Sequence, residues 1–364
     1  MNNSLTNKEI SFVLYCVIVG YGVINLPKTV AEASGTSGWI SMFIMGSVAI
    51  IVTYMITYIS YVHEDKVFYE FSEILVGKIF TYIFLTIYII YFFISFTMLT
   101  RIYAETINLT ILNRTPVWSI SLLFFIVIYY ALSKGLPTIG RISLLYGFMS
   151  LLGFIFLNTI LASQGKLVNI RPLFISKSIV SYIKDSFKLV FPFLGMEILF
   201  FIPINRKYNK KILKYTICTL FFITLLYFYT VESSISVIGV ESIIHYKTPL
   251  FSVVKGLDVP YLEFFRRLDG IYIIYWSMNI ICSISIWGYV LTLCINKFFK
   301  NLQYNTLIKL VVIISFIASQ IPKTTKDVEQ LLKFSGYLGI VTTLIIPFIL
   351  LIMTKVKNHG KKIH

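Results

Sequence analysis

The chain has 364 residues, of which 57% are hydrophobic, 16% aromatic and only 13% charged. A soluble domain carries about 25% charged residues, because its surface must be hydrated. This composition excludes a soluble enzyme, a nucleic-acid-binding domain and a disordered chain. It predicts an all-α polytopic membrane protein.

The net charge of +16 comes from basic residues that stand in short runs between apolar stretches. Examples are Arg206-Lys207, Lys210-Lys211 and the tail that follows Lys355. Basic loops of this kind meet anionic lipid headgroups. Membrane lipid, rather than nucleic acid, is therefore the predicted partner of the positive charge.

A helix that spans a bilayer needs about 20 mostly apolar residues. The chain contains ten such stretches and leaves no room for a soluble domain, so residues 1–364 are predicted to form a single integral membrane domain. The predicted segments are 9–33, 37–62, 79–107, 116–133, 141–163, 180–204, 211–239, 268–296, 305–321 and 334–354. Thr6 and Glu9 form a capping box at the start of the first segment, and no cleavable signal peptide is expected.

The orientation follows from the distribution of lysine and arginine between the loops. The densest basic clusters fall on the side that also holds the N-terminus. Basic loops stay in the cytoplasm, and an even number of crossings returns the chain to its starting side. Both termini are therefore predicted to be cytoplasmic.

The cysteines, the histidines and the known catalytic motifs give no indication of an active site or a metal site. The cysteines lie inside apolar stretches, where small buried side chains are a simpler interpretation than a disulfide or a metal site: Cys16, Cys218, Cys282 and Cys294. The histidines have no second ligand at metal spacing, and no nucleophile–base pair, P-loop or dinucleotide motif occurs. We expect no enzyme activity, no metal and no cofactor.

Two of the ten segments carry residues that interrupt a helix. Residues 20–27 read Gly-Tyr-Gly-Val-Ile-Asn-Leu-Pro, and residues 191–197 read Phe-Pro-Phe-Leu-Gly-Met-Glu. Proline removes a backbone donor, and glycine makes unwinding easy. Unwound backbone deep in a membrane must line a cavity or contact protein, since lipid cannot hydrogen-bond it. Both segments are predicted to be broken, with ordinary proline kinks as the alternative.

The positions of the two breaks suggest an inverted repeat. They fall in segments 1 and 6, the first of each set of five, in repeat halves of about 8–163 and 179–355. Because five is odd, the second half enters the membrane from the opposite side. Broken helices at corresponding places in inverted halves indicate a ligand site at the membrane midplane. Half-helix N-termini bind a carboxylate and exposed carbonyls bind an ammonium, so the predicted ligand is a small zwitterion.

The breaks supply most of the candidate ligand-binding residues. A carboxylate at the centre of a membrane helix costs about 2.5–3.5 kcal/mol to insert, so Glu197 is expected to bind a ligand ammonium, carry a proton or brace the break. The glycines allow close approach of a ligand or of another helix. The candidates in the breaks are Gly20, Tyr21, Gly22, Val23, Phe193, Gly195 and Glu197.

Two further segments are expected to complete the pocket. By their depth in segment 3 we select Tyr91 and Ser95, and in segment 8 Trp276, Asn279 and Ser283. Asn279 is the strongest of these, because an amide buried in apolar surroundings needs a partner. Two charge pairs, Lys28 with Glu32 and Arg101 with Glu105, are four residues apart and are predicted to be helical ion pairs.

The interrupted segments carry a resemblance to a known family. Residues 20–27 resemble the G-x-G-I-x-x-L-P stretch of the amino acid–polyamine–organocation superfamily. Residues 191–197 resemble the sixth helix of its spore germination permease branch, the B-subunits of nutrient germinant receptors, as does the stretch from Arg267 through Asp269 to Trp276. The resemblance implies a LeuT-like five-plus-five fold. It also implies a spore inner-membrane receptor that senses a small nutrient, usually an amino acid, beside an A-subunit and a lipoprotein C-subunit.

Two other functions remain open. The first is an amino-acid or polyamine transporter of the same fold, and the second is a structural or channel-like assembly subunit that binds no nutrient. Proton-coupled relatives often place a lysine in the fifth helix, whereas segment 141–163 has none, and only Ser283 and Ser285 resemble a sodium site in segment 8. The sequence therefore favours sensing over concentrative transport.

Overall fold

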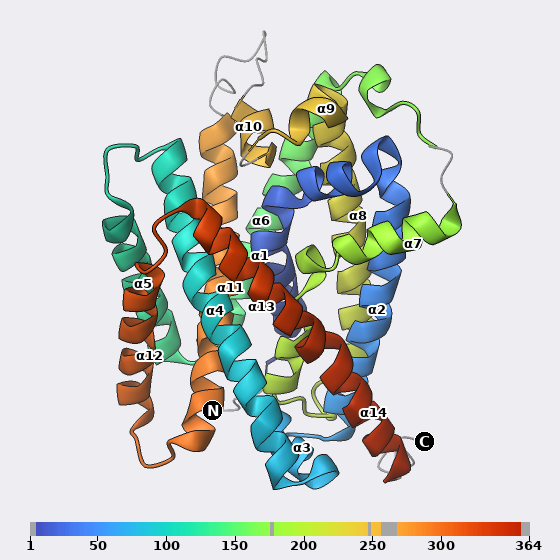
Figure 1. The fold of residues 1–364 in the computed structure, drawn as a ribbon. Coiled ribbons are helices and arrows are strands. Elements are labelled where there is room, and N and C mark those ends of the chain that lie inside the picture. The colour runs from blue at the N-terminus through green and yellow to red at the C-terminus, as the bar shows by residue number, and fades with distance from the viewer. Residues whose placement is uncertain (1–4, 175–177, 247–248, 256–267, 358–364) are drawn as a thin grey trace.

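The computed structural model describes residues 5–174, 178–246, 249–255 and 268–357, which form helices and connections without strands (Figure 1). Helices satisfy their own backbone hydrogen bonds, as a membrane-spanning chain requires. The long elements are α1 (Asn7–Ser34), α2 (Gly38–Val62), α4 (Lys78–Thr110), α5 (Val117–Lys134), α6 (Leu136–Gln164), α8 (Ile212–Ile238), α11 (Leu268–Phe298), α12 (Tyr304–Ser319), α13 (Thr325–Ile340) and α14 (Ile346–Val356).

Every predicted segment coincides with helical structure, although segment 180–204 is divided into short pieces. Seven helical stretches of the described residues are long and apolar enough to cross a membrane, and the first, Gly22–Val62, contains the end of α1 and all of α2. Phe191–Phe201 and α12 are shorter apolar helices. The all-helical membrane class is confirmed, whereas the number of ten crossings stays a prediction.

Short helices occupy several of the connections. They are η1 (Gly35–Ser37), α3 (Phe68–Val76), η2 (Leu167–Ile170), α7 (Ile179–Lys188), η3 (Phe191–Phe193), η4 (Met196–Phe201), α9 (Val240–Ile243) and α10 (Pro249–Lys255). Segment 334–354 is longer than expected. It begins at α13, where Thr324 and Asp327 form a capping box, and a π-helical turn, η6 (Val341–Ile345), joins α13 to α14.

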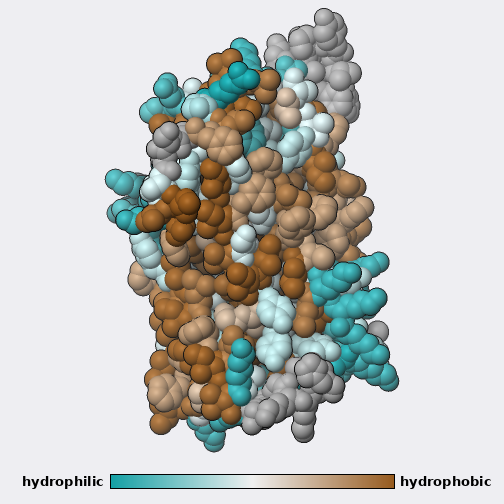
Figure 2. All heavy atoms as spheres, turned by 90° about the vertical axis from the view of Figure 1, so that its right-hand side faces the viewer, coloured by the Kyte–Doolittle hydropathy of each residue, from teal (hydrophilic) through white to brown (hydrophobic). Residues whose placement is uncertain are grey.

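α1 lies at the centre of the bundle and packs against α6, α8 and α11 (Figure 1). Its side chains at Val13, Val19 and Val23 are fully buried. The outer helices instead expose apolar side chains, such as Ile51 on α2 and Ile179 on α7. Figure 2 shows this broad hydrophobic surface, with hydrophilic residues gathered in small groups near its edges. A surface of this kind suits contact with lipid chains rather than water.

The described cysteines are all free. Cys16, Cys282 and Cys294 are buried, as predicted, but Cys218 is exposed. Cys218 lies on the outward face of α8, and a thiol is apolar enough to face lipid.

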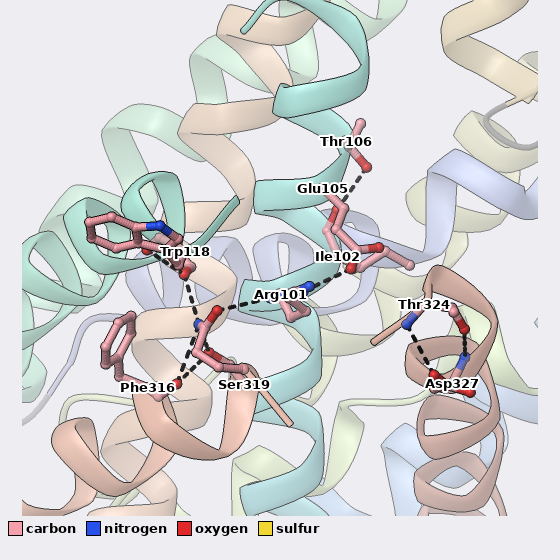
Figure 3. A network of polar contacts seen from close by, with 11 residues as sticks. Arg101, Ile102, Glu105, Thr106, Trp118, Phe316, Ser319, Thr324 and Asp327 are labelled. Carbon is pink, nitrogen blue, oxygen red and sulfur yellow. Dashed lines mark hydrogen bonds and ion pairs between the residues drawn. The ribbon is translucent and has the colours of Figure 1, made fainter. Parts of the chain in front are cut away.

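A buried ion pair ties the third predicted segment to its neighbours (Figure 3). Arg101 Nε lies 2.7 Å from Glu105 Oε1, which confirms the predicted pair. Arg101 also donates to Gln320 Oε1 at 2.9 Å, and the Gln320 amide donates to Ser121 Oγ at 3.0 Å. The network therefore joins α4, α5 and the end of α12. The other predicted pair, Lys28 with Glu32, is a looser contact of 3.9 Å.

The start of α1 and the end of α14 lie at the same end of the bundle (Figure 1). The connection 202–211 closes this end. Arg206 Nε donates to the Tyr61 carbonyl at 3.0 Å, and its backbone N–H donates to Glu64 Oε1 at 2.9 Å. These contacts fix the connection to the last turn of α2.

Asn209 fixes the same connection to the N-terminus. Its side chain is fully buried. The Asn209 amide donates to the Leu5 carbonyl and to Asn7 Oδ1, both at 3.0 Å, and its Oδ1 accepts from the Asn205 N–H at 3.1 Å. One amide thus holds the start of α1 against the connection that precedes α8.

We expect the substitution Asn209→Ala to destabilise this end of the bundle by about 1–3 kcal/mol, because it leaves buried polar groups unpaired. Limited proteolysis at the N-terminus and the melting temperature in detergent measure the effect. Asn301→Ala, at an exposed position after α11, is the matched control. Equal behaviour of the two variants would contradict the assigned role.

Candidate ligand cavity beside the broken segment

The sixth predicted segment is broken, as expected. α7 ends at Lys188, and the chain continues as two short 3₁₀ helices, η3 and η4, separated by Leu194 and Gly195. Pro192 lies in η3, where it cannot donate a backbone hydrogen bond. The α-helix therefore does not resume after α7 in this segment.

Gly195 is the point at which the backbone turns. Its φ of 115° lies in the left-handed region, which side chains with a Cβ rarely adopt. A Cβ built on Gly195 would also overlap Val17 on α1. Both the conformation and the close approach to α1 therefore require glycine here.

The predicted break in the first segment is wrong. α1 is one continuous helix from Asn7 to Ser34, and Pro27 lies inside it. A single proline removes only one backbone donor, so the helix can continue through it. A neighbouring side chain also supports α1 beside the broken sixth segment. The Tyr227 hydroxyl of α8 lies 2.9 Å from the carbonyl oxygens of both Ile18 and Pro192. This phenol bridges α1 and η3.

The two glycines of α1 serve close packing instead of unwinding. A Cβ on Gly20 would lie 2.7 Å from the Ser283 Cβ of α11, and a Cβ on Gly22 would lie 2.6 Å from the Pro192 carbonyl oxygen. Trp276 of α11 donates its indole N–H to the Gly20 carbonyl at 2.8 Å. The two glycines thus allow α11 and η3 to pack closely on the continuous α1.

A cavity of ≈ 660 Å³ lies beside the break, which is an ordinary size for a small-molecule site. Its walls come from α1, α4, η3, α11 and α13. The lining residues are Val17, Ile18, Gly22, Asn25, Lys28, Thr29, Glu32, Tyr91, Ser95, Leu99, Phe191, Pro192, Leu194, Trp287, Thr325, Lys326, Glu329, Leu332, Lys333, Ser335 and Gly336.

The buried end of the cavity carries neutral polar groups. Ser95 of α4 and Ser335 of α13 are almost fully buried, and their hydroxyls lie 2.7 Å apart. Tyr91 is also buried and adds a phenol to the lining. Asn25 of α1 lines the cavity beside them. This end can donate and accept hydrogen bonds without a net charge.

The mouth of the cavity carries charges of both signs. Lys28 and Glu32 lie near the C-terminal end of α1, and Lys326, Glu329 and Lys333 lie on α13. Because α1 begins at the end that holds the termini, this mouth opens at the opposite end. The wall therefore presents groups for a carboxylate and for an ammonium.

Glu197 lies behind the cavity wall and is fully buried. Its Oε2 accepts a hydrogen bond from Thr343 Oγ1 at 2.7 Å and one from the Gly195 N–H at 3.1 Å. The Tyr91 hydroxyl interacts with the same carboxyl. Glu197 thus braces the break against the π-helical turn, one of the roles expected from the sequence.

The structure divides the predicted ligand-binding residues into two groups. Gly22, Tyr91 and Ser95 line the cavity. The second group is buried but does not line the cavity and consists of Gly20, Val23, Phe193, Gly195, Glu197, Trp276, Asn279 and Ser283. The side chain of Tyr21, and Arg267 from the motif before α11, lie outside the described residues.

Sequence reasoning missed the α13 wall. Thr325, Glu329, Leu332 and Gly336 recur at helical spacing and face the cavity. The predicted tenth segment began only at residue 334, because the turn before it is charged. The capping box at Thr324 and Asp327 was a sequence signal for the earlier helix start.

The fold is that of an all-helical membrane protein and is shared with a solved transporter. A Na⁺-coupled sialic acid symporter, solved in a substrate-bound outward-open state, superimposes with a TM-score of 0.66 at 14% identity, covering 93% of this chain and 77% of that chain. This likeness supports the predicted LeuT-like fold class.

The family follows from the sequence comparisons. Residues 4–328 match the profile of the spore permease family, described as spore germination protein. The chain is 25% identical to spore germination protein YndE of Bacillus subtilis over 99% of both chains. It is 26% identical to spore germination protein A2 of the same organism, over 94% of this chain and 93% of that one. The chain belongs to the spore germination permease family and is an integral membrane protein, as the resemblance implied.

We expect Gly195→Ala to destabilise the protein by about 1–3 kcal/mol or more. The new Cβ is strained at this positive φ and overlaps Val17. The melting temperature of the purified protein measures this loss. Gly270→Ala on α11, where a Cβ meets nothing within 4 Å, is the control and should not lower it, because alanine favours a helix over glycine. A stable Gly195→Ala protein would show that the break has another conformation.

Proposed function

We propose that this chain is the membrane subunit of a spore nutrient germinant receptor and that it binds a small zwitterionic nutrient, such as an amino acid, in the cavity. The observation that carries the proposal is the cavity of ≈ 660 Å³ beside a broken helix in a member of the germination family. The cavity exceeds the volume of a free amino acid and leaves room for water.

The lining supports a zwitterion as the ligand class. A ligand carboxylate finds the ammonium groups of Lys28, Lys326 or Lys333 near the mouth. A ligand ammonium finds the carboxylates of Glu32 or Glu329. Farther in, the Ser95 and Ser335 hydroxyls accept and donate hydrogen bonds. Hydrogen-bonding groups at fixed positions in a buried site give it selectivity for ligands that match them.

The proposed signal is a population shift. A ligand in this cavity contacts α1, α4 and α13 together with the irregular stretch around η3. If it binds one packing of these elements more tightly than another, it shifts the equilibrium toward that packing. The partner subunits then read the change. We propose an A-subunit and a lipoprotein C-subunit as these partners, in the spore inner membrane with both termini cytoplasmic.

A transporter of amino acids or polyamines is the second candidate, because the superimposed symporter shares the fold. Ser283 and Ser285, the predicted sodium-site residues, already have protein partners. Ser283 Oγ lies 3.5 Å from the Val17 carbonyl, and Ser285 Oγ donates to the Ile281 carbonyl at 2.7 Å. Both hydroxyls donate in these contacts, so their oxygen lone pairs stay available to a cation and the uptake experiment below decides between the two functions.

We expect Ser95→Leu to raise the nutrient concentration needed for half-maximal germination by at least about tenfold, equal to ~1.4 kcal/mol. The larger side chain fills the buried end of the cavity and removes the contact with Ser335. Germination of spores that carry the variant measures the effect, with immunoblots of the membrane fraction to establish that the protein is present. Ser133→Leu, at an exposed position on α5, is the matched control.

An unchanged nutrient response in Ser95→Leu spores would contradict nutrient binding in this cavity. It would favour an assembly subunit without a ligand.

Uptake separates the receptor from the transporter. Vesicles that contain the full chain should not accumulate radiolabelled L-alanine or putrescine above the level of empty vesicles, with or without a sodium or proton gradient. Accumulation that an ionophore abolishes would establish the transporter and displace the receptor proposal.

A further inference from the structure

We propose that Glu197 is a proton-binding site that links the cavity to the π-helical turn between α13 and α14. In this conformation the carboxyl holds its proton. The inference does not depend on whether the protein senses or transports its ligand, because it rests on the surroundings of Glu197 alone.

The first argument is the lack of a countercharge. Glu197 is fully buried, and among the described residues it forms no ion pair with lysine, arginine or histidine. Its Oε2 accepts hydrogen bonds from two neutral donors, Thr343 Oγ1 and the Gly195 N–H. An ionised carboxylate in such a low-dielectric site costs several kcal/mol even when it is hydrogen-bonded. A bound proton removes this cost.

The second argument is the asymmetry of the two carboxyl oxygens. Oε2 accepts two hydrogen bonds, as the carbonyl oxygen of a neutral acid does. Oε1 has no hydrogen-bond partner among the described residues. The Tyr91 hydroxyl interacts with this carboxyl. A protonated Oε1 carries a hydrogen to donate, and the Tyr91 hydroxyl oxygen is a group that can accept it.

The groups that face Glu197 from each neighbouring element are neutral. From α4 these are the phenols of Tyr88 and Tyr91. The π-helical turn contributes the Thr343 hydroxyl. α2 packs on the same short helix through Thr53, which donates to the Met196 sulfur at 2.9 Å. α1 and α11 bring no charged side chain to the carboxyl within the described residues.

Tyr91 gives the site access to the ligand. Its side chain lines the cavity, and its hydroxyl interacts electrostatically with the Glu197 carboxyl. The neighbouring Tyr88 donates to the Thr342 carbonyl of the π-helical turn at 2.9 Å. A proton can therefore pass between the cavity and Glu197 through the Tyr91 hydroxyl, and its loss would disturb the contacts that hold Gly195 and Thr343 in place.

Infrared spectroscopy of the purified full chain tests the proposal directly. The spectrum of the wild type minus that of Glu197→Gln at neutral pH should contain the C=O band of a protonated carboxylic acid. Glu329→Gln at the half-buried mouth is the matched control, and its difference spectrum should contain carboxylate bands instead. A pair of carboxylate bands lost in Glu197→Gln would overturn the proposal.

Tyr91→Phe tests the link to the cavity without altering the carboxyl. The variant should keep the acid band but shift its frequency, because the hydroxyl partner is gone. An unshifted band would contradict the link, and this test does not need Glu197→Gln to fold.

Thermal stability gives an independent readout with a defined sign. Glu197 keeps its proton in the folded protein but ionises freely in the unfolded chain, so its contribution to stability falls as pH rises above the ordinary carboxyl range. The melting temperature of the wild type relative to that of Glu197→Gln should therefore decrease from pH 5 to pH 8. Stabilisation of the wild type, but not of Glu197→Gln, by sodium chloride over choline chloride would overturn the proposal in favour of a sodium site.

Discussion

Backbone groups that leave a helix inside a membrane must find partners within the protein, and this constraint organises the structure. At the break in the sixth segment the partners are few and well placed. Tyr227 contacts the Pro192 carbonyl, and Glu197 accepts from the Gly195 N–H. The continuous α1 provides the surface on which the break rests. The cavity exists because these contacts stabilise a stretch of chain that is not α-helical.

The same contacts connect the cavity to distant parts of the fold. Tyr91 lines the cavity and interacts electrostatically with Glu197, which in turn accepts from Thr343 in the π-helical turn. At the other end of the bundle, Asn209 joins the N-terminus to the connection before α8. One end is thus closed by buried hydrogen bonds, whereas the other presents a charged mouth. The two ends of the bundle therefore differ in charge and in how they are held together.

The sequence predicted the positions of the helices well, because long apolar runs have few alternatives in a membrane. It also located the break at 191–197, where proline, glycine and a carboxylate coincide. It failed at 20–27, since glycine permits both unwinding and close packing, and only the neighbours Ser283 and Pro192 decide between them. The α13 wall was missed because its first turns are charged. A search for apolar stretches leaves such turns out of a predicted membrane helix, even where they face a cavity. The inverted repeat and the ligand-binding roles stay predictions.

The π-helical turn at 341–345 stores one residue more than an α-helical turn of the same height. A surplus residue of this kind can migrate along a helix while the hydrogen-bonded ladder stays closed around it. Its passage would rotate α13 about its own axis and carry Glu329 and Ser335 away from the cavity. The helix that forms the charged wall therefore departs from regular α-helical spacing at the turn whose Thr343 contacts Glu197.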